Sequence, residues 1–500
     1  MKKTSVIAAL SVAAALVLSA AAVWMGALNQ DEGWYLYAAN LVSEGKVPYR
    51  DFFYTQGPLL PLVYSAFTPV WKSFGLLGAR LFTLALGLMS IVFFCATARR
   101  LAGKGAAAIV FLLLATNLYH LYYLAIPKTY ALASLFVAVG FWLYSIADDR
   151  LRRQAEAVDF VRLLALFGAA MAIAFAAGAR ISLGVILPVV GLALLYRAVR
   201  EKKCLPVIAF AAGGALALAL VYGPFVFDES AVKGLVLAQK YHAARGGFDP
   251  VWTVGSLSRL VRWYLPIAAA VAVIIFLRLE SGAFRLSASL PLFAFLAVFA
   301  LQMSAPFPYE DYQVPVMGLL AVWAAANLVR FPIMRCLVVV MFVSFAASFG
   351  SPLLEKWAPN GQDRFWSLKK TAYELPQLRE AARTIEQLDP GGKELFTQDL
   401  YLAIETDRKV PGGLEMGPFS MLNDDEWHKL LETADAPVAA LSGYSFAIEP
   451  PVCNERSVEK QLEYWSILKK RYTLAGRIDN FGQGATTLLI LKRNAEAKAK

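Results

Sequence analysis

The sequence predicts an all-α polytopic membrane domain followed by a small C-terminal α/β domain. Of the 500 residues, 58% are hydrophobic and only 17% are charged, and the mean hydropathy is +0.53. This composition is too apolar for an ordinary soluble globule. Apolar stretches of membrane-spanning length recur through residues 1–350, whereas hydrophobicity falls and a globular pattern begins at Ser351. We therefore expect a membrane domain at 1–350 and a soluble domain at 351–500.

The formal net charge of +11 belongs to the membrane part. Residues 351–500 hold 20 Lys and Arg against 22 Asp and Glu, and residues 1–350 hold 28 against 15. Basic loops that orient membrane helices explain this excess, so no nucleic acid partner is expected. The four cysteines include no CxxC pair and the three histidines lie far apart, which argues against a disulfide framework and a zinc site.

About eleven spans are expected, because an unpaired backbone polar group in lipid costs several kcal/mol and each apolar stretch is long enough to form a spanning helix. The expected spans are 5–28, 79–98, 105–123, 129–147, 161–179, 182–198, 205–227, 264–279, 286–304, 313–330 and 332–350. An alternative for the first is a cleaved signal peptide at 1–22, although the apolar run continues to Leu28.

Basic residues test this arrangement. With the N-terminal lysines inside, all the basic clusters between spans fall on the same side, as the positive-inside rule requires. These clusters are Arg99, Arg100 and Lys104; Arg150, Arg152 and Arg153; Arg197, Arg200, Lys202 and Lys203; Arg278 and Arg285; and Arg330 and Arg335. The odd number of spans then places the C-terminal domain outside the cytoplasm, together with the long loops 29–78 and 228–263.

The first outside loop holds acidic and aromatic residues against the membrane. Residues 32–44 have the pattern of an amphipathic helix lying in the interface, with aromatics at headgroup level, and Gly45 and Pro48 end it. Residues 58–74 predict a second interfacial helix. The loop is therefore suited to presenting carboxylates at the bilayer surface.

This loop resembles the first periplasmic loop of GT-C class membrane glycosyltransferases, in particular bacterial relatives of the protein O-mannosyltransferases (glycosyltransferase family 39) and of the lipid A aminoarabinose transferase. The resemblance rests on Asp31-Glu32, Tyr35, Tyr37, Gly45, Pro48-Tyr49-Arg50-Asp51-Phe52-Phe53 and Gly57-Pro58. A weaker match is the aromatic segment 306–315 before the tenth span. The resemblance implies transfer of a sugar from a polyprenyl-phosphate donor to an acceptor hydroxyl, with inversion, outside the cytoplasm.

Such a transfer needs a carboxylate base within hydrogen-bond reach of the acceptor hydroxyl. The resemblance assigns this role to Asp31, with Glu32 assisting; the structural alternative for Asp31 is an N-cap of a helix starting at Glu32. Tyr35, Tyr49 and Asp51 are candidates for acceptor or loop positioning. For Asp51, a turn or an ion pair with Arg50 is an equal alternative.

The leaving lipid phosphate needs cations near the outer ends of spans. Lys128 and Arg180 lie in short outside loops against the positive-inside trend, and Arg80 begins the second span; snorkelling to the interface is the alternative for all three. Tyr309 and Tyr312 are candidate phosphate hydrogen-bond donors, or members of an aromatic belt. The sequence identifies no cofactor, and Glu310 and Asp311 leave a divalent metal open.

The tail predicts helices at 372–389, 424–433 and 457–470 and strands at 394–398, 437–442, 472–478 and 486–492. No nucleotide or metal motif occurs in it, so acceptor recognition or stability is the expected role.

The expected protein is an integral membrane enzyme of a bacterial inner membrane with a periplasmic C-terminal domain. Its expected partners are a polyprenyl-phosphate-linked sugar, the bilayer, and a glycolipid, polysaccharide or protein acceptor. The alternatives are a transporter or flippase of lipid-linked sugars and a non-catalytic scaffold.

Overall fold

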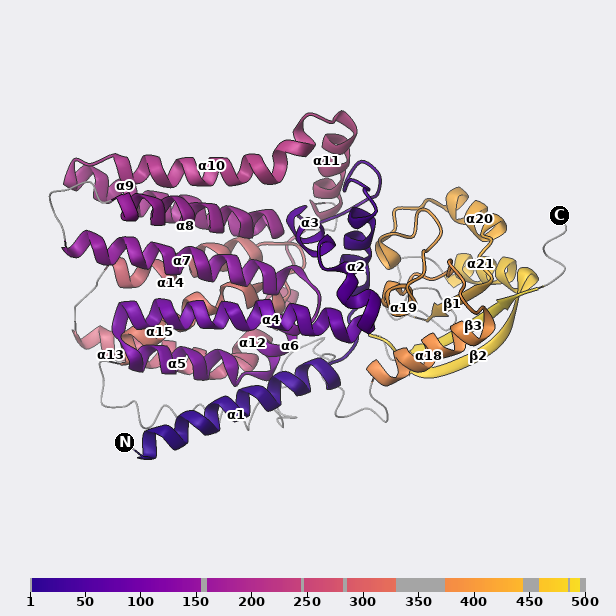
Figure 1. Cartoon of the computed structure of the whole chain (residues 1–500), viewed down its shortest axis with the longest axis horizontal. Coiled ribbons are helices and arrows are strands. Elements are labelled where there is room, and N and C mark those ends of the chain that lie inside the picture. The colour runs from indigo at the N-terminus through magenta and orange to yellow at the C-terminus, as the bar shows by residue number, and fades with distance from the viewer. Residues whose placement is uncertain are drawn as a thin grey trace.

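The computed structural model describes residues 2–153, 160–243, 247–281, 286–329, 374–443, 458–483 and 486–494. A bundle of helices occupies one end of the molecule and the C-terminal domain, residues 374–494, the other (Figure 1). Helices α2 and α3 lie between them. The expected eleventh span, 332–350, and the expected boundary at Ser351 lie outside the described residues.

The bundle consists of helices that run mostly along the long axis of the molecule. They are α1 (Lys2–Met25), α4 (Thr68–Ala102), α5 (Lys104–Ala115), α6 (Leu118–Ala125), α7 (Thr129–Arg153), α8 (Phe160–Ala179), α9 (Ile186–Glu201), α10 (Leu205–Val226), α12 (Pro250–Trp263), α13 (Leu265–Ser281), α14 (Leu286–Met303) and α15 (Val314–Leu328). Helix α11 (Glu229–Ala243) follows α10 at the end facing the C-terminal domain. Among the described residues, five helices are long and apolar enough to cross a membrane, or seven if each of two bent pairs is one span.

The two bent pairs change the expected spans. Helices α5 and α6 meet at 72°, and α12 and α13 at 92°. The span expected at 105–123 corresponds to this broken pair of helices, and Asn117 caps α6 by accepting from the backbone N–H of His120. The Asn117 amide also donates to the carbonyl of Trp263 at 2.9 Å, which joins the two bends.

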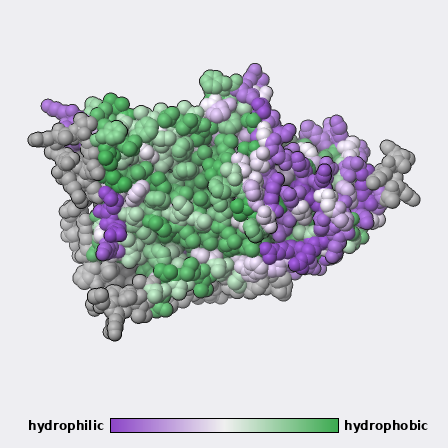
Figure 2. All heavy atoms as spheres, viewed as in Figure 1, coloured by the Kyte–Doolittle hydropathy of each residue, from purple (hydrophilic) through white to green (hydrophobic). Residues whose placement is uncertain are grey.

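Figure 2 shows a broad hydrophobic band over the bundle, with hydrophilic residues over the C-terminal domain and at the opposite end of the molecule. The basic residues Arg99 and Arg100 end α4, Lys104 begins α5, and Arg200 ends α9. These helix ends lie at the end of the bundle remote from the C-terminal domain (Figure 1). The chain is thus an integral membrane protein with basic residues gathered at one end.

Helix α2 (Gln30–Ser43) is the predicted first loop helix, but its surroundings differ from the prediction. Trp34, Tyr35 and Tyr37 are almost fully buried rather than lying open at headgroup level. The C-terminal domain covers Trp34 and Tyr37, and a Cβ on Gly33 would lie only 2.4 Å from the backbone nitrogen of Tyr401. The sequence pattern could not reveal this contact, because the contacting residues of the C-terminal domain lie about 370 positions further along the chain.

The predicted interfacial helix at 58–74 is divided in two. Helix α3 (Leu59–Ser65) is short, and α4 already begins at Thr68. Inside α4 the chain bends at Gly75, whose φ of 61° favours glycine. The Glu405 carboxylate occupies this bend and accepts from the N–H of Leu76 at 2.7 Å.

The described part of the C-terminal domain contains four helices and a three-stranded sheet. The helices are α18 (Glu374–Leu388), α19 (Leu400–Glu405), α20 (Asp424–Thr433) and α21 (Val458–Arg471), and the strands are β1 (Val438–Ser442), β2 (Tyr472–Phe481) and β3 (Thr486–Arg493). The order is β1-β3-β2 with both pairings antiparallel, as in Ala440 opposite Ile490. The expected strand at 394–398 forms only isolated bridges, one of them Phe396 with Ala439.

Polar contacts fix this domain to α2. The side-chain amide of Gln30 donates to Asp399 at 2.5 Å and to the Tyr401 hydroxyl at 3.3 Å. The N–H of Val410 donates to the Tyr37 hydroxyl at 3.0 Å. Hydrogen bonds between buried groups strengthen in a low dielectric, so the domain is held in one position against α2.

Candidate active site

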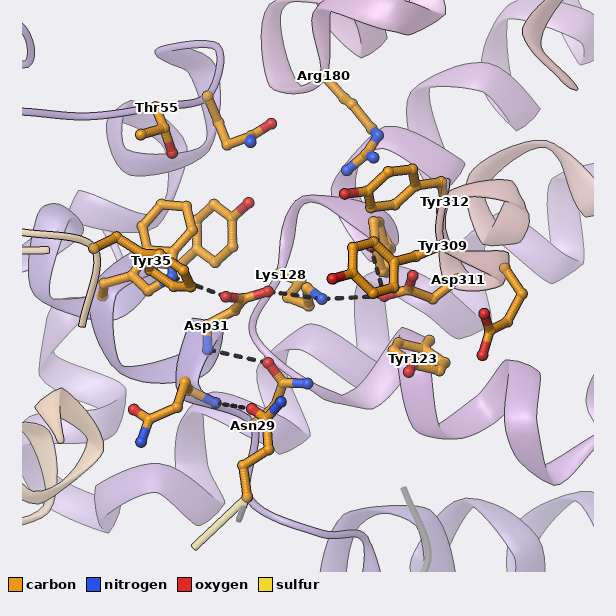
Figure 3. A pocket seen from close by; sticks show the side chains of 17 residues that line it. Asn29, Asp31, Tyr35, Thr55, Tyr123, Lys128, Arg180, Tyr309, Asp311 and Tyr312 are labelled. Carbon is orange, nitrogen blue, oxygen red and sulfur yellow. Dashed lines mark hydrogen bonds and ion pairs between the residues drawn. The ribbon is translucent and has the colours of Figure 1, made fainter. Parts of the chain in front are cut away.

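A cavity of about 400 Å³ lies where the bundle, α2 and the C-terminal domain meet. Figure 3 shows Asp31, Lys128 and Asp311 in a row across it, with Arg180 and Tyr312 on one side and Asn29 on another. Six of the nine predicted site residues line it: Asp31, Tyr35, Lys128, Arg180, Tyr309 and Tyr312.

Asp31 stands in the first turn of α2. The N-cap of this helix is Asn29, whose side chain accepts from the Asp31 N–H at 3.0 Å, so the alternative role of Asp31 as N-cap is wrong. One Asp31 carboxylate oxygen accepts from the indole N–H of Trp34 at 3.0 Å, and the other lies 2.8 Å from the Lys128 ammonium. The side chain remains 25% exposed, so a carboxylate oxygen can still accept a hydrogen bond from a substrate.

Lys128 bridges two carboxylates. Its ammonium lies 2.8 Å from Asp31 and 3.2 Å from Asp311, which also accepts from the Tyr130 hydroxyl at 2.8 Å. Burial alone would lower the pKa of Lys128, but Asp31, Tyr130 and Asp311 raise it well above its ordinary value. The ammonium therefore stays charged at physiological pH and ties α2 to the segment before α15.

Arg180 joins α8 to the short helix η1 (Ile181–Val185). Its guanidinium lies over the ring of Tyr312, 4.3 Å from the centroid, and 5.2 Å from that of Tyr130. Its Nε is buried with no hydrogen-bond partner, and within the described residues no carboxylate forms an ion pair with it. Arg180 is therefore a cation available to an anionic ligand.

Tyr309 precedes the short helix η2 (Glu310–Gln313), and Tyr312 lies within it. Their rings meet edge to face, with centroids 5.5 Å apart. Burial raises the pKa of Tyr312 to about 12, with Arg180 opposing the shift. Its hydroxyl thus keeps its proton and can donate a hydrogen bond.

The two carboxylates considered for a metal face cations instead. Glu310 pairs with Arg259 of α12 at 3.0 Å, and Asp311 pairs with Lys128. Across the described ranges no group of three or more metal-ligating side chains occurs.

Glu32 lies outside the cavity, although it follows Asp31. Its carboxylate is fully buried and receives two hydrogen bonds from Arg80, at 2.7 and 2.6 Å. The Arg80 guanidinium also donates to the carbonyls of Val23, Gly26 and Ala27 at the end of α1. In this geometry Glu32 and Arg80 join α2, α4 and α1, and neither lines the cavity.

Tyr49 and Asp51 also lie outside the cavity lining. The Tyr49 hydroxyl donates to the carbonyl of Gln56 and its ring packs against Phe225 at 5.5 Å. Asp51 pairs with Arg50 at 2.9 Å, and this contact lowers its pKa to about 2. The ion-pair alternative for Asp51 matches this geometry.

A second cavity of about 440 Å³ adjoins the first. The two share Thr55, Gln56, Arg180 and Tyr312. The rest of the second cavity is largely apolar, with Ile181, Leu301, Pro306 and Phe307 among its lining. Arg180 thus stands where a polar cavity opens into an apolar one.

Several lining residues were missed by the sequence analysis. Tyr123 and Tyr130 flank Lys128, and their rings lie 5.7 and 4.9 Å from its ammonium; the aromatic run around Lys128 was a usable signal. Phe419 and Gln483 come from the C-terminal domain, and nothing in their local sequence points to the cavity.

Neither a protein-family model nor a curated protein sequence matches the chain. Solved structures do. The apo crystal structure of ArnT from Cupriavidus metallidurans matches with a TM-score of 0.67 at 15% identity, covering 99% of both chains. The same protein bound to undecaprenyl phosphate matches with a TM-score of 0.66 at 16% identity, covering 98% of both.

The archaeal oligosaccharyltransferase AglB from Archaeoglobus fulgidus, in complex with an inhibitory peptide and a dolichol-phosphate, also matches. Its TM-score is 0.50 at 11% identity, covering 87% of this chain and 69% of that one. Similarity at these identities establishes the fold. The chain therefore has the fold of the GT-C class of membrane glycosyltransferases, as its first loop predicted.

Proposed function

We propose that this protein transfers a sugar from a polyprenyl-phosphate donor to an acceptor hydroxyl, with Asp31 as the general base. The observation that carries the proposal is the position of Asp31 in a cavity that also presents Arg180, a cation with no carboxylate partner among the described residues. The ArnT structure contains undecaprenyl phosphate and the AglB structure a dolichol-phosphate, which supports a lipid phosphate as part of the donor.

The base acts on the acceptor. Trp34 and Lys128 hold the two Asp31 carboxylate oxygens in place, which fixes the direction from which a hydroxyl can approach. As the acceptor oxygen bonds to the anomeric carbon, its proton passes to Asp31, and the bond from that carbon to the phosphate oxygen breaks. The polyprenyl phosphate leaves with the bonding electron pair, and attack from the opposite face inverts the anomeric centre.

Arg180 is the residue best placed to bind the donor phosphate. Lys128 already neutralises two carboxylates, whereas the Arg180 guanidinium can form a forked contact with phosphate oxygens. Tyr312, next to it, can donate to the same group. The apolar second cavity, which shares Arg180, suits the first prenyl units. We therefore propose that Lys128 is a bridging residue and that Arg180 stabilises the charge that develops on the leaving phosphate.

We further propose that the site faces the outside of a bacterial inner membrane, in contact with the periplasm. Basic residues at the ends of α4 and α9 gather at the end of the bundle opposite the cavity, where the positive-inside rule places the cytoplasm.

Asp31→Asn tests the reaction. Asparagine keeps the shape and can still accept from Trp34, but it cannot take up the proton, so transfer should fall by about 10²–10⁴-fold while the protein stays folded. The measurement is release of radiolabelled sugar from undecaprenyl-phosphate donors by the full chain in nanodiscs with a membrane extract as acceptor source.

The matched control is Asp51→Asn, a carboxylate of the same loop that pairs with Arg50 outside the cavity. This variant should stay within a few-fold of the wild type. Full transfer by Asp31→Asn would remove Asp31 as the base. Movement of labelled lipid between leaflets without sugar release would instead identify a flippase.

A further inference from the structure

The C-terminal domain supplies one wall of the cavity. Gln483, which follows β2, and Phe419, which ends the short helix η4 (Gly417–Phe419), line it beside Trp34 of α2. The rings of Trp34 and Phe419 meet edge to face, with centroids 6.5 Å apart. This wall is on the same side as Asp31 and at the junction of the two parts of the molecule.

The amide of Gln483 has a fixed orientation. Its oxygen accepts from the backbone N–H of Gln30 at 2.8 Å, and a backbone N–H can bond only to the oxygen end of an amide. The NH₂ end therefore carries two donors, and Gln483 lines the same cavity as Asp31, the residue that follows Gln30. An acceptor hydroxyl needs both elements: a carboxylate to take its proton and a donor to orient its oxygen lone pairs.

The charges of the cavity are divided unevenly between its walls. The charged lining residues are Asp31, Lys128, Arg180, Glu310 and Asp311, and all come from the membrane part. Among the described residues, the C-terminal domain adds only Phe419 and Gln483 to this lining, and neither is charged. Lys128 is committed to two carboxylates, so a donor phosphate on Arg180 leaves no cation in this lining for a second anion.

We propose that the acceptor is an uncharged sugar of a glycan, bound between α2 and the C-terminal domain, with the Gln483 NH₂ group donating to its reacting hydroxyl oxygen. This inference rests on the proposed function. A sugar ring has hydroxyls on its edge and apolar C–H faces, which match an amide donor and the aromatic wall of Trp34 and Phe419. An acceptor with a phosphate near its reacting hydroxyl would meet an excess of carboxylates with no free cation.

Two substitutions of Gln483 separate binding from positioning. Gln483→Glu keeps an oxygen for the Gln30 N–H but removes the NH₂ donors, whereas Gln483→Met removes both at similar length. If Gln483 orients the acceptor, both variants should raise the KM for acceptor about tenfold, the value of one hydrogen bond, and leave the KM for donor unchanged. If Gln483 only holds α2, the Glu variant should behave as wild type and the Met variant should fail, and that result overturns the proposal.

Gln377→Ala is the matched control. Gln377 is an amide of the same domain that donates to the carbonyl of Asp479 and lies outside the cavity lining, so both KM values should be unchanged. The Glu variant also adds a negative charge beside Asp31. The pH profile of this variant resolves the point. If its lost activity returns at higher pH, the added charge has changed Asp31 as a base, and this result counts against the donor role of Gln483.

The acceptor class is tested by binding of neutral oligosaccharides of several sugar types, the same oligosaccharides with a phosphate monoester, and a Ser- and Thr-rich peptide to the wild-type chain in nanodiscs. We expect a neutral oligosaccharide to bind at least tenfold more tightly than its phosphorylated form, with no peptide binding. Preference for the phosphorylated form or the peptide, or no binding of any neutral glycan, overturns the proposal. A different result would contradict the proposed function: the wild-type chain would not cleave the sugar from the donor.

Discussion

Asp31 and Glu32 show how far two neighbouring acidic residues can diverge. Asp31 lines the cavity and keeps 25% of its side chain exposed, whereas Glu32 is fully buried against Arg80. Successive residues of a helix point about 100° apart, so one faces the cavity and the other faces α1 and α4. The sequence placed both in the right loop, but only the position of Arg80 decides which carboxylate is fully buried.

Arg180→Gln tests the proposed role of Arg180 in binding the donor phosphate. Glutamine retains a polar side chain but removes the charge and the fork, and a charged hydrogen bond contributes about 1.5–3 kcal/mol. We expect the KM for an undecaprenyl-phosphate-linked sugar to rise about 10–100-fold, with lower affinity for undecaprenyl phosphate itself measured by isothermal titration.

Arg50→Gln is the control, because Arg50 is an outer-loop cation that pairs with Asp51 and Asp228 outside the cavity. Its donor KM should match the wild type. Equal donor KM values for Arg180→Gln and the wild type would show that another group holds the phosphate.

At the scale of elements, the sequence placed most helices within a few residues. Local signals suffice for this: the apolar runs of α8 and α10, and the capping residues of α20, are readable from sequence. The errors arose where distant residues decide the geometry. The bend between α5 and α6 is joined to the bend between α12 and α13 through Asn117 and Trp263, which are 146 positions apart.

The same limit applies to the candidate site. Lys128 and Arg180 stood out because they violate the positive-inside trend, and the structure brings both to the cavity with Asp31. Gln483 carried no such signal. Its place depends on how the C-terminal domain docks on α2, through Gln30 and the close approach of Gly33 to Tyr401.

The Glu32–Arg80 pair joins three helices, and its removal should be costly. Glu32→Ala leaves the Arg80 guanidinium buried without its partner, which destabilises by about 3–5 kcal/mol. The double variant Glu32→Met, Arg80→Met leaves no unpaired charge, although it also removes the donors to the carbonyls of Val23, Gly26 and Ala27, and it should lose less than Glu32→Ala. Thermal unfolding in detergent, followed by tryptophan fluorescence, measures both.

Arg50→Ala at the exposed Arg50–Asp51 pair is the control and should leave the unfolding midpoint nearly unchanged, because solvent screens that pair. A double variant no more stable than Glu32→Ala would show that the pair itself, rather than the unpaired charge, holds the helices together.

For the whole molecule, the polarity of the bundle connects topology to chemistry. The hydrophobic band lies between a basic end and the C-terminal domain, and the cavity lies at the junction with that domain (Figures 1 and 2). Under the proposed function, a lipid-linked donor would keep its chain in the band while its phosphate binds Arg180 in the cavity. The proposed function would thus account for the acidic residue in the first loop and for the cations Lys128 and Arg180 in short loops at the same end of the bundle.

The orientation can be tested with the cysteines of the chain. Cys204 is exposed just before α10, at the basic end, and Ala475 is exposed on β2 of the C-terminal domain. Two variants with a single cysteine are needed. In the first, the other three cysteines are replaced by alanine, so that Cys204 is the only thiol. In the second, all four cysteines are replaced and Ala475→Cys supplies the only thiol. A membrane-impermeant maleimide added to spheroplasts should label the Ala475→Cys chain at once and Cys204 only after the membrane is permeabilised. Labelling in the reverse order would place the cavity on the cytoplasmic side, where the donor would have to be used before it crosses the membrane.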